Sequence, residues 1–452
     1  MVATSQHLAS QAGLDILKMG GNAIDAAIAA AACLTVVEPT SNGIGGDAFV
    51  LVWVKNKLYG LNASGPSPQS LSIEALKKRG FHEMPKYGFT PVTVPGVPAA
   101  WAELSARFGK LSLTESLKPA IHYAECGHPV SPVVSHYWQA AYKTFSEKLK
   151  GKEFEPWFNT FAPLGRAPAA GEIITLPDHA ATLREIGDTK GESFYRGGLA
   201  KKIDQFSRQF SGYLTLSDLA LYKPEWVDPL KVTYRGYDVW EMPPNGHGLV
   251  ALMALNILNG LSLDNNHPAD AYHMQMEAIK IAFADGQKHI TDPKNMTVNI
   301  SNFLSEAYAS ERRKAITPYA SLPPAGKPES GGTVYLATAD HEGNMVSYIQ
   351  SNYMGFGSGL VVPGTGVSLH NRGISFSLDE AHDNRLEPGK RPYHTIIPGF
   401  LTKDGSPIGP FGIMGAFMQP QGHVQLIVNM IDFKLNPQAA LDRLRWQWRE
   451  GM

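Results

Sequence analysis

The stretch NAIDAAIAAAACLTVVEP, residues 22–39, constrains the fold of this chain more than any other. It consists mostly of Ala, Ile, Leu and Val, and its only charged residues are Asp25 and Glu38. A helix that is apolar on nearly every side has to be covered on every side. A glycine loop follows and runs into a predicted strand, DAFVLVWV, whose predicted hairpin partner is KLYGLNAS. The sequence therefore predicts a layered structure that places helices beside a sheet.

A segment rich in glycine and proline interrupts the chain late in the sequence. Residues 70–320 are predicted to be mostly helical, whereas strands predominate after residue 332. Between them lies SLPPAGKPESGG, residues 321–332, whose composition is typical of a linker. The elements predicted after it are strands at 333–338, 345–350, 360–362, 367–369 and 394–400, a hairpin turn at Asp404-Gly405 and a helix near 421–431. Because strands occur at both ends of the chain, we expect one layered α/β domain with the linker inside it.

Composition and charge narrow the classes of function. The chain of 452 residues has a formal net charge of −1 and no basic run, which argues against a nucleic-acid partner. Its two cysteines, Cys33 and Cys126, are too few for a disulfide framework or a cysteine-based zinc site. Neither a membrane span nor a signal peptide is recognisable. We therefore expect a cytoplasmic protein, or a secreted or periplasmic one if a leader has been removed.

The linker ends in Gly-Gly and is followed by Thr333, the first residue of a predicted strand. A threonine in a strand usually needs no explanation beyond its β propensity. The alternative is an N-terminal nucleophile. If the peptide bond after Gly332 is cut, the new α-amine, with a pKa of about 8, can take the proton of the Thr333 hydroxyl. A loose linker would give that hydroxyl access to the Gly332 carbonyl.

Four stretches occur in a particular order along the chain. They are DAAIAAAACLTVVEPTSNGIGGDAFVL, YRGYDVWEMPP, TVYLATADHEGNMVSYIQSNYMGFGSGLVVPGTGVSLHN and EPGKRPYHTIIPGF. Together they resemble the γ-glutamyltransferase (glutathione hydrolase) family of proenzymes. The resemblance implies a four-layer αββα N-terminal nucleophile hydrolase fold of mixed α/β class. It also implies autocatalytic cleavage between Gly332 and Thr333 into a large subunit, 1–332, and a small subunit, 333–452, and neither a metal nor a cofactor is expected.

The resemblance implies roles for four residues in catalysis. Thr333 corresponds to the nucleophile, with its own α-amine as general base. Ser351 aligns with a hydroxyl residue that hydrogen-bonds the nucleophile, although a serine on an edge strand would need no such role. Gly415 and Ala416 match a Gly-Gly pair whose backbone N–H groups form the oxyanion hole. Ala416 keeps its N–H, but a positive φ at this position would penalise alanine.

The residues that correspond to the substrate pocket depart from the family pattern. His394 and Thr395 stand where the family has a Ser-Ser pair that contacts the substrate. Alternatively, His394 is a packed histidine with no role in binding. The arginine expected after the GIGG loop is missing from LNASGPSPQS. Arg372 and Ser375 replace residues that bind an α-amine. Arg372 is either a surface arginine or a new carboxylate clamp, and the pattern resembles the branch of glutaryl-cephalosporin acylases.

We expect a self-processing amidohydrolase and acyltransferase that forms an acyl-threonine intermediate. Its substrate would be a small-molecule or peptide γ-glutamyl amide similar to glutathione, or alternatively a glutaryl-type amide. A second hypothesis is an inactive binding homologue that keeps only the fold. A third, a nucleotide-dependent enzyme, rests on GIGGDA alone, which follows a helix and precedes a strand, the reverse of a dinucleotide loop. A homo-oligomer is compatible with all three hypotheses.

Overall fold

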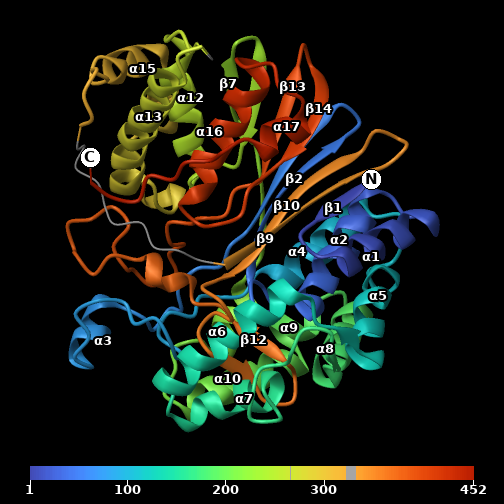
Figure 1. The fold of residues 1–452 in the computed structure, drawn as a ribbon. Coiled ribbons are helices and arrows are strands. Elements are labelled where there is room, and N and C mark those ends of the chain that lie inside the picture. The colour runs from blue at the N-terminus through green and yellow to red at the C-terminus, as the bar shows by residue number, and fades with distance from the viewer. Residues whose placement is uncertain (265, 322–331, 452) are drawn as a thin grey trace.

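The computed structural model describes residues 1–264, 266–321 and 332–451. Its largest sheet is antiparallel, has six strands and lies at the centre of the molecule (Figure 1). From edge to edge the strands are β1 (Val2–Thr4), β9 (Gly332–Ala339), β10 (Met345–Tyr353), β2 (Asp47–Val54), β3 (Lys57–Ala63) and β6 (Glu225–Val227). The strand that begins at Gly332 thus lies between the N-terminal strand and the predicted hairpin partner β10.

A second, four-stranded antiparallel sheet packs against the first. Its order is β14 (Ser406–Phe411), β13 (Gly399–Lys403), β8 (Tyr237–Glu241) and β7 (Leu230–Tyr234). Two short strand pairs lie outside both sheets: β4 (His128–Pro129) with β5 (Ile173–Ile174), and β11 (Leu360–Val362) with β12 (Val367–Leu369). The predicted turn at Asp404-Gly405 joins β13 to β14, and both of its residues have positive φ, 50° and 75°, as a two-residue hairpin turn requires.

Helices cover the outer face of each sheet (Figure 1). The N-terminal group contains α1 (His7–Lys18), α2 (Ala23–Val37), α3 (Ile73–Lys78), α4 (Val97–Phe108), α5 (Leu113–Cys126), α6 (Pro132–Lys148), α7 (Glu155–Phe161), α8 (Pro177–Thr189), α9 (Glu192–Arg196), α10 (Gly198–Gln209) and α11 (Leu216–Leu221). The later group contains α12 (Gly248–Asn259), α13 (Pro268–His289), α14 (Ile300–Phe303), α15 (Glu306–Arg313), α16 (Met418–Ile431) and α17 (Pro437–Asp442). As predicted, every residue of α2 is buried.

The alternating side chains of β2 explain how the layers are held together. Ala48, Val50 and Val52 point into the core shared with α2. Phe49, Leu51 and Trp53 point the other way, and Trp53 stacks on Phe400 of the second sheet with ring centroids 5.7 Å apart. A strand buried on both faces has to be apolar at successive positions. The resulting order, helix, sheet, sheet, helix, is the four-layer αββα arrangement that was predicted.

The strand predicted at 394–400 is present but begins five residues later than predicted. The strand in this region, β13, begins only at Gly399, and His394 forms a single isolated bridge with Gly246. Pro392 and Pro398 flank the intervening residues, and a proline cannot donate to a sheet ladder. The predicted linker at 321–332 lies mostly outside the described residues.

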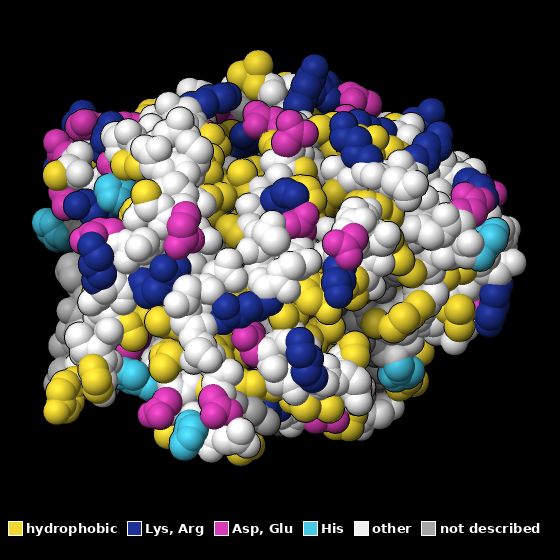
Figure 2. Space-filling view, turned by 90° about the horizontal axis from the view of Figure 1, so that it is seen from above, with side chains coloured by type: hydrophobic (Ala, Val, Ile, Leu, Met, Phe, Trp, Pro, Cys, Tyr) yellow, Lys and Arg dark blue, Asp and Glu magenta, His cyan; other side chains and the backbone are white. Residues whose placement is uncertain are grey.

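The surface carries charges of both signs. On the face seen in Figure 2, basic and acidic side chains alternate with small apolar areas. Among the described residues, no helix is both long and apolar enough to cross a bilayer. Within the same residues, no group of three or more His, Cys, Asp or Glu side chains is arranged to hold a metal ion.

Candidate active site

Thr333 lies at the start of β9, opposite the end of β10. Its side chain is buried, and its hydroxyl donates a long hydrogen bond of 3.4 Å to Ser351 Oγ. Ser351 Oγ also accepts the backbone N–H of Tyr353 at 2.8 Å. The pairing of β9 with β10 shifts register between Gln350 and Tyr353, and such a bulge re-aims side chains at the end of a strand. Because β10 lies between β9 and β2, the edge-strand reading of Ser351 is wrong.

Tyr353 has a left-handed backbone, with φ of 71°. This conformation is rare for a bulky residue and is kept only where the surroundings enforce it. Two contacts do so here: the N–H bond to Ser351, and the guanidinium of Arg372, which lies 4.6 Å from the centroid of the Tyr353 ring. The strained residue thus links the partner of Thr333 to a buried arginine.

The loop before α16 contains Gly415 and Ala416, with φ of 116° and 50°. Among the described residues, neither backbone N–H has a hydrogen-bond acceptor. Buried or nearly buried N–H groups are rarely left unpaired in folded proteins. Alanine in this left-handed conformation costs about 1 kcal/mol relative to glycine. The penalty that was foreseen for a positive φ at Ala416 therefore applies.

A pocket of about 590 Å³ adjoins these elements. Its walls include Tyr353, Ser375, Tyr393 and Phe417, and the rings of Tyr393 and Phe417 stack with centroids 6.1 Å apart. The Oγ of Ser375 is buried without a hydrogen-bond partner in the described chain. Lys86 and His382 also line the pocket. This cavity joins the end of β10, the turn that contains Ser375 and the residue after Ala416, so it can present a small molecule to all three.

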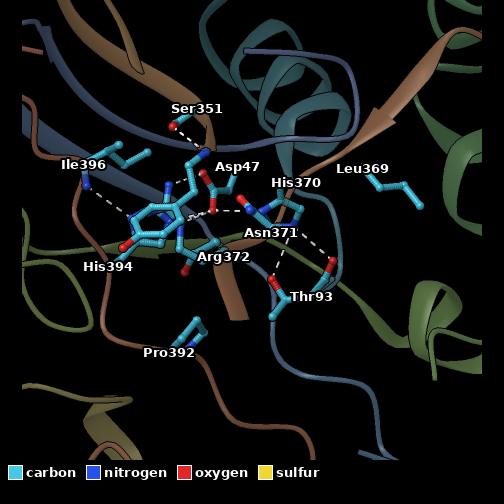
Figure 3. A network of polar contacts seen from close by, with 12 residues as sticks. Asp47, Thr93, Ser351, Leu369, His370, Asn371, Arg372, Pro392, His394 and Ile396 are labelled. Carbon is cyan, nitrogen blue, oxygen red and sulfur yellow. Dashed lines mark hydrogen bonds and ion pairs between the residues drawn. The ribbon is translucent and has the colours of Figure 1, made fainter. Parts of the chain in front are cut away.

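Behind the pocket wall, Asp47 organises a fully buried polar network (Figure 3). Arg372 grips its carboxylate with two bonds, Nε to Oδ2 at 2.8 Å and Nη2 to Oδ1 at 3.1 Å, and donates Nη1 to Thr395 Oγ1 at 2.8 Å. His394 Nε2 lies 2.7 Å from Oδ2. His370 Nδ1 lies 3.2 Å from the same oxygen, without hydrogen-bond geometry. Arg372 is completely buried, so the alternative of a surface arginine is wrong.

The ion pair between Asp47 and Arg372 carries the charges of this network. Burial alone would raise the pKa of Asp47, but Arg372 and, after it, His394 and His370 hold that pKa well below its usual range. Burial and the Arg372 charge lower the pKa of His394 to about 4. His394 Nδ1 accepts the N–H of Ile396 at 3.3 Å, so its proton is on Nε2 and points at Asp47. At neutral pH the site therefore contains an ionised Asp47, a charged Arg372 and a neutral His394.

The structure brings the sequence-predicted residues together in two groups. Thr333 and Ser351 form the first, and Arg372, His394 and Thr395 form the second around Asp47. Ser375 lies in the pocket wall, at the end of the 3₁₀ turn Arg372–Ser375. Sequence reasoning missed Asp47. The available signal was a carboxylate at the first position of an otherwise apolar strand.

The glycines of GIGGDA are explained by packing. A Cβ on Gly45 would lie 2.2 Å from the carbonyl oxygen of Ser368, and one on Gly46 would lie 2.6 Å from that of Ser351. Both distances are shorter than any real contact of a Cβ. This loop needs glycine because it passes close to other backbone segments, and this explanation requires no phosphate.

Comparisons with known proteins cover the whole described fold. A family profile described as Gamma-glutamyltranspeptidase matches residues 9–452. The chain is 36% identical to a glutathione hydrolase-like YwrD proenzyme of Bacillus subtilis (strain 168), over 99% of this chain and 85% of that protein. It is 34% identical to an oxamate amidohydrolase proenzyme of Klebsiella pneumoniae, over 99% of this chain and 84% of that protein. A crystal structure of a cephalosporin acylase from Bacillus halodurans superposes with a TM-score of 0.97 at 61% identity, covering all of this chain and 83% of that one.

Proposed function

The chain belongs to the gamma-glutamyltranspeptidase family, and from this premise we propose that it is a self-processing amidohydrolase with Thr333 as its nucleophile. It has the N-terminal nucleophile hydrolase fold of its relatives. The observation that carries the proposal is the Thr333 hydroxyl, hydrogen-bonded to Ser351 at the beginning of β9. A nucleophile oriented by a second hydroxyl is the arrangement that covalent catalysis needs.

Maturation would cut the chain between Gly332 and Thr333. The Thr333 hydroxyl attacks the Gly332 carbonyl, and collapse of the tetrahedral intermediate breaks the C–N bond, which frees the α-amine of Thr333 and leaves an ester. Water then hydrolyses this ester, which releases the Gly332 carboxylate and regenerates the Thr333 hydroxyl. The products are a large segment, 1–332, and a small segment, 333–452. Both contribute to the six-stranded sheet, since β9 and β10 pair with β1 and β2. The two segments therefore stay together after the cut.

In the mature enzyme the α-amine of Thr333 takes the hydroxyl proton as the oxygen attacks the substrate amide. The backbone N–H groups of Gly415 and Ala416 are free to stabilise the tetrahedral oxyanion, and one such donor is worth about 3 kcal/mol. Collapse expels the amine, which receives the proton held by the α-ammonium. Water, or an acceptor amine, then resolves the acyl-Thr333 ester. Ser351 holds the attacking oxygen throughout.

The substrate class follows from the relatives together with the pocket. Similar proenzymes are named glutathione hydrolase-like and oxamate amidohydrolase, so we propose a small amide whose acyl part enters the pocket beside Tyr353 and Ser375. The main candidate is a γ-glutamyl amide. A glutaryl-type amide is the second candidate, and the 61% identity to a cephalosporin acylase favours it.

The test is the intact mass of the purified chain and of Thr333→Ala. We expect the native protein to yield two fragments, the smaller starting at Thr333, and the variant to remain uncut. Thr333→Ser is the matched control and should still be cut, because it keeps a hydroxyl. Processed protein is then assayed on γ-glutamyl, glutaryl and oxamic amides. A native chain that stays whole, or a Thr333→Ala chain that is cut at the same bond, would contradict the proposal.

A further inference from the structure

Arg372 is a carboxylate clamp that the protein fills with its own side chain. Asp47 occupies the two-pronged face of the guanidinium, with Nε–Oδ2 and Nη2–Oδ1 distances of 2.8 and 3.1 Å. This bidentate geometry is the one by which arginine recognises a free carboxylate. We propose that Asp47 is a specificity-determining residue: it takes the place that an acyl carboxylate would occupy at Arg372, so the carboxylate of a γ-glutamyl or glutaryl group has to lie elsewhere in the pocket. This inference rests on the proposed amidohydrolase function.

The clamp has little capacity left for a second anion. Arg372 uses three of its N–H groups on Asp47 and Thr395. The negative charge of Asp47 balances the positive charge of Arg372, and the pair is completely buried. An acyl carboxylate that approached would lose its hydration and meet a neutral ion pair in return. Stripping water from a carboxylate is costly and needs a compensating partner.

The clamp lies directly behind the wall of the substrate pocket. Arg372 begins the 3₁₀ turn that ends at Ser375, whose unpaired Oγ lines the pocket. The face of its guanidinium lies 4.6 Å from the ring of Tyr353, another wall residue. The bond from Arg372 to Thr395 places it two residues from Tyr393, on the same wall. A change in the charge of the clamp is therefore felt inside the pocket.

Removing the Asp47 carboxylate would create an anion site with donors already in place. Arg372 Nε, Arg372 Nη2 and His394 Nε2 all converge on the two oxygens of Asp47 (Figure 3). In Asp47→Ala the lost atoms are those of one carboxylate group, so formate fits the vacated space. An exogenous carboxylate then restores the interactions that the substitution removed.

The first experiment needs no enzymatic activity. Thermal unfolding of Asp47→Ala is followed in sodium formate and in sodium chloride at equal ionic strength. We expect formate to raise the midpoint of Asp47→Ala in a saturable way, because a ligand that binds only the folded state stabilises it. Wild type and Asp47→Ala/Arg372→Met should not respond. Glu241→Ala is a matched control. It removes an equally buried carboxylate that contacts a histidine and no arginine. Formate should therefore leave its unfolding midpoint unchanged.

The second experiment uses the isosteric variant Asp47→Asn, which leaves no cavity. We compare kcat/KM for glutaryl and butyryl p-nitroanilides, which differ in the terminal carboxylate. The preference for the glutaryl substrate should rise about tenfold in Asp47→Asn, since Arg372 is then uncompensated; tenfold corresponds to about 1.4 kcal/mol. A merely structural role of Asp47 would lower both values together.

The inference is overturned if formate leaves Asp47→Ala unchanged, or if Asp47→Asn hydrolyses both substrates in the wild-type ratio. If Asp47→Ala does not fold, the isosteric variant alone decides. A wild-type chain that is neither cut nor active on any amide refutes the proposed function instead. In that case the formate experiment still judges the clamp, so the two failures are distinguishable.

Discussion

Two buried carboxylates, one in each sheet, have pKa values that folding shifts in opposite directions. Asp47 is the first residue of β2 and Glu241 is the last residue of β8, and both side chains are completely buried. Each lies against a histidine, at 2.7 Å from His394 and at 2.5 Å from His423. The pKa of Asp47 is held well below its usual range. The pKa of Glu241 is raised by burial, against the opposing influence of His423.

The difference is the arginine. Arg372 is always charged and offers Asp47 two parallel N–H donors. Glu241 has only the imidazole, and its second oxygen, Oε2, has no hydrogen-bond partner among the described residues. A single imidazole donor can orient a buried carboxylate but does not replace the hydration that its charge has lost. The protein therefore maintains a buried arginine–carboxylate pair beside the pocket, whereas the recorded partner of Glu241 is a histidine.

Replacing Arg372 by methionine removes the arginine that distinguishes Asp47 from Glu241. We expect it to cause the largest loss of stability among the variants considered. The substitution leaves Asp47 buried without a cation, and breaking a buried pair on one side costs about 3–5 kcal/mol. Urea unfolding followed by circular dichroism measures the loss. Arg391→Met is a matched control: Arg391 is also buried, but its partner Glu225 is half exposed and can return to water. We expect a clearly smaller loss for it.

The double variant Asp47→Asn/Arg372→Met shows whether the charge or the packing is responsible. With no charge left unpaired, it should recover a large part of the stability that Arg372→Met loses. If the double variant is as unstable as Arg372→Met, the cost comes from lost packing against Tyr353, and the electrostatic contrast with Glu241 no longer explains it.

The sequence predicts local elements well because their causes are local. The all-apolar run of α2 and the Asp404-Gly405 turn act over a few residues, and both are found as expected. Asp47 and Arg372 are 325 residues apart, and no short-range pattern connects them. The positive φ of Ala416 is likewise imposed by its surroundings and is not written in its side chain. Motif order was therefore enough to predict the fold and nominate Thr333, but not to find the partner of the clamp.

Acid should lower the free energy of unfolding through His394, and we expect this to be the second largest of the predicted effects. The pKa of His394 is lowered to about 4 in the folded protein, from 6.5 as its ordinary value. The unfolded chain therefore binds a proton more readily, so this contribution to stability is complete above pH 6.5 and is lost as the pH falls toward 4. The shift corresponds to about 3 kcal/mol at most.

Unfolding of wild type and His394→Gln between pH 8 and pH 4 tests this linkage. His394→Gln removes the titrating group, so its stability should fall less steeply with acid than that of wild type. His128 and His179 also have pKa values lowered to about 4 by burial, so part of the acid dependence should survive in the variant. Identical slopes in the two proteins would contradict the assignment to His394.

Thr395→Val measures what the third hydrogen bond of Arg372 contributes to stability, and we expect a smaller loss. Valine has nearly the shape of threonine but cannot accept the Nη1 hydrogen bond, which is 2.8 Å long. A buried charged donor left without its acceptor costs about 1–3 kcal/mol. Because the two bonds to Asp47 remain, we expect a value near the lower end, read from urea unfolding. Ser368→Ala, another small buried hydroxyl that does not contact Arg372, is the comparison variant. Equal losses in both would mean that the third bond adds nothing.

Glu241→Gln should have the smallest effect and the opposite dependence on pH. Since the pKa of Glu241 is raised on folding, its contribution to stability is present below its unfolded pKa and is lost as the pH rises through the folded value. Glutamine keeps the shape and carries no charge, so at neutral pH the variant should lie within about 1 kcal/mol of wild type. Relative to wild type it should gain stability from pH 4 to pH 8. Asp47→Asn should change in the other direction, chiefly below about pH 4, because the Asp47 pKa is lowered on folding from its ordinary value of 3.8. Two buried carboxylates whose neutral replacements respond to pH with opposite signs would trace the difference to Arg372. Parallel responses would mean that burial governs both sites and that the arginine is not decisive.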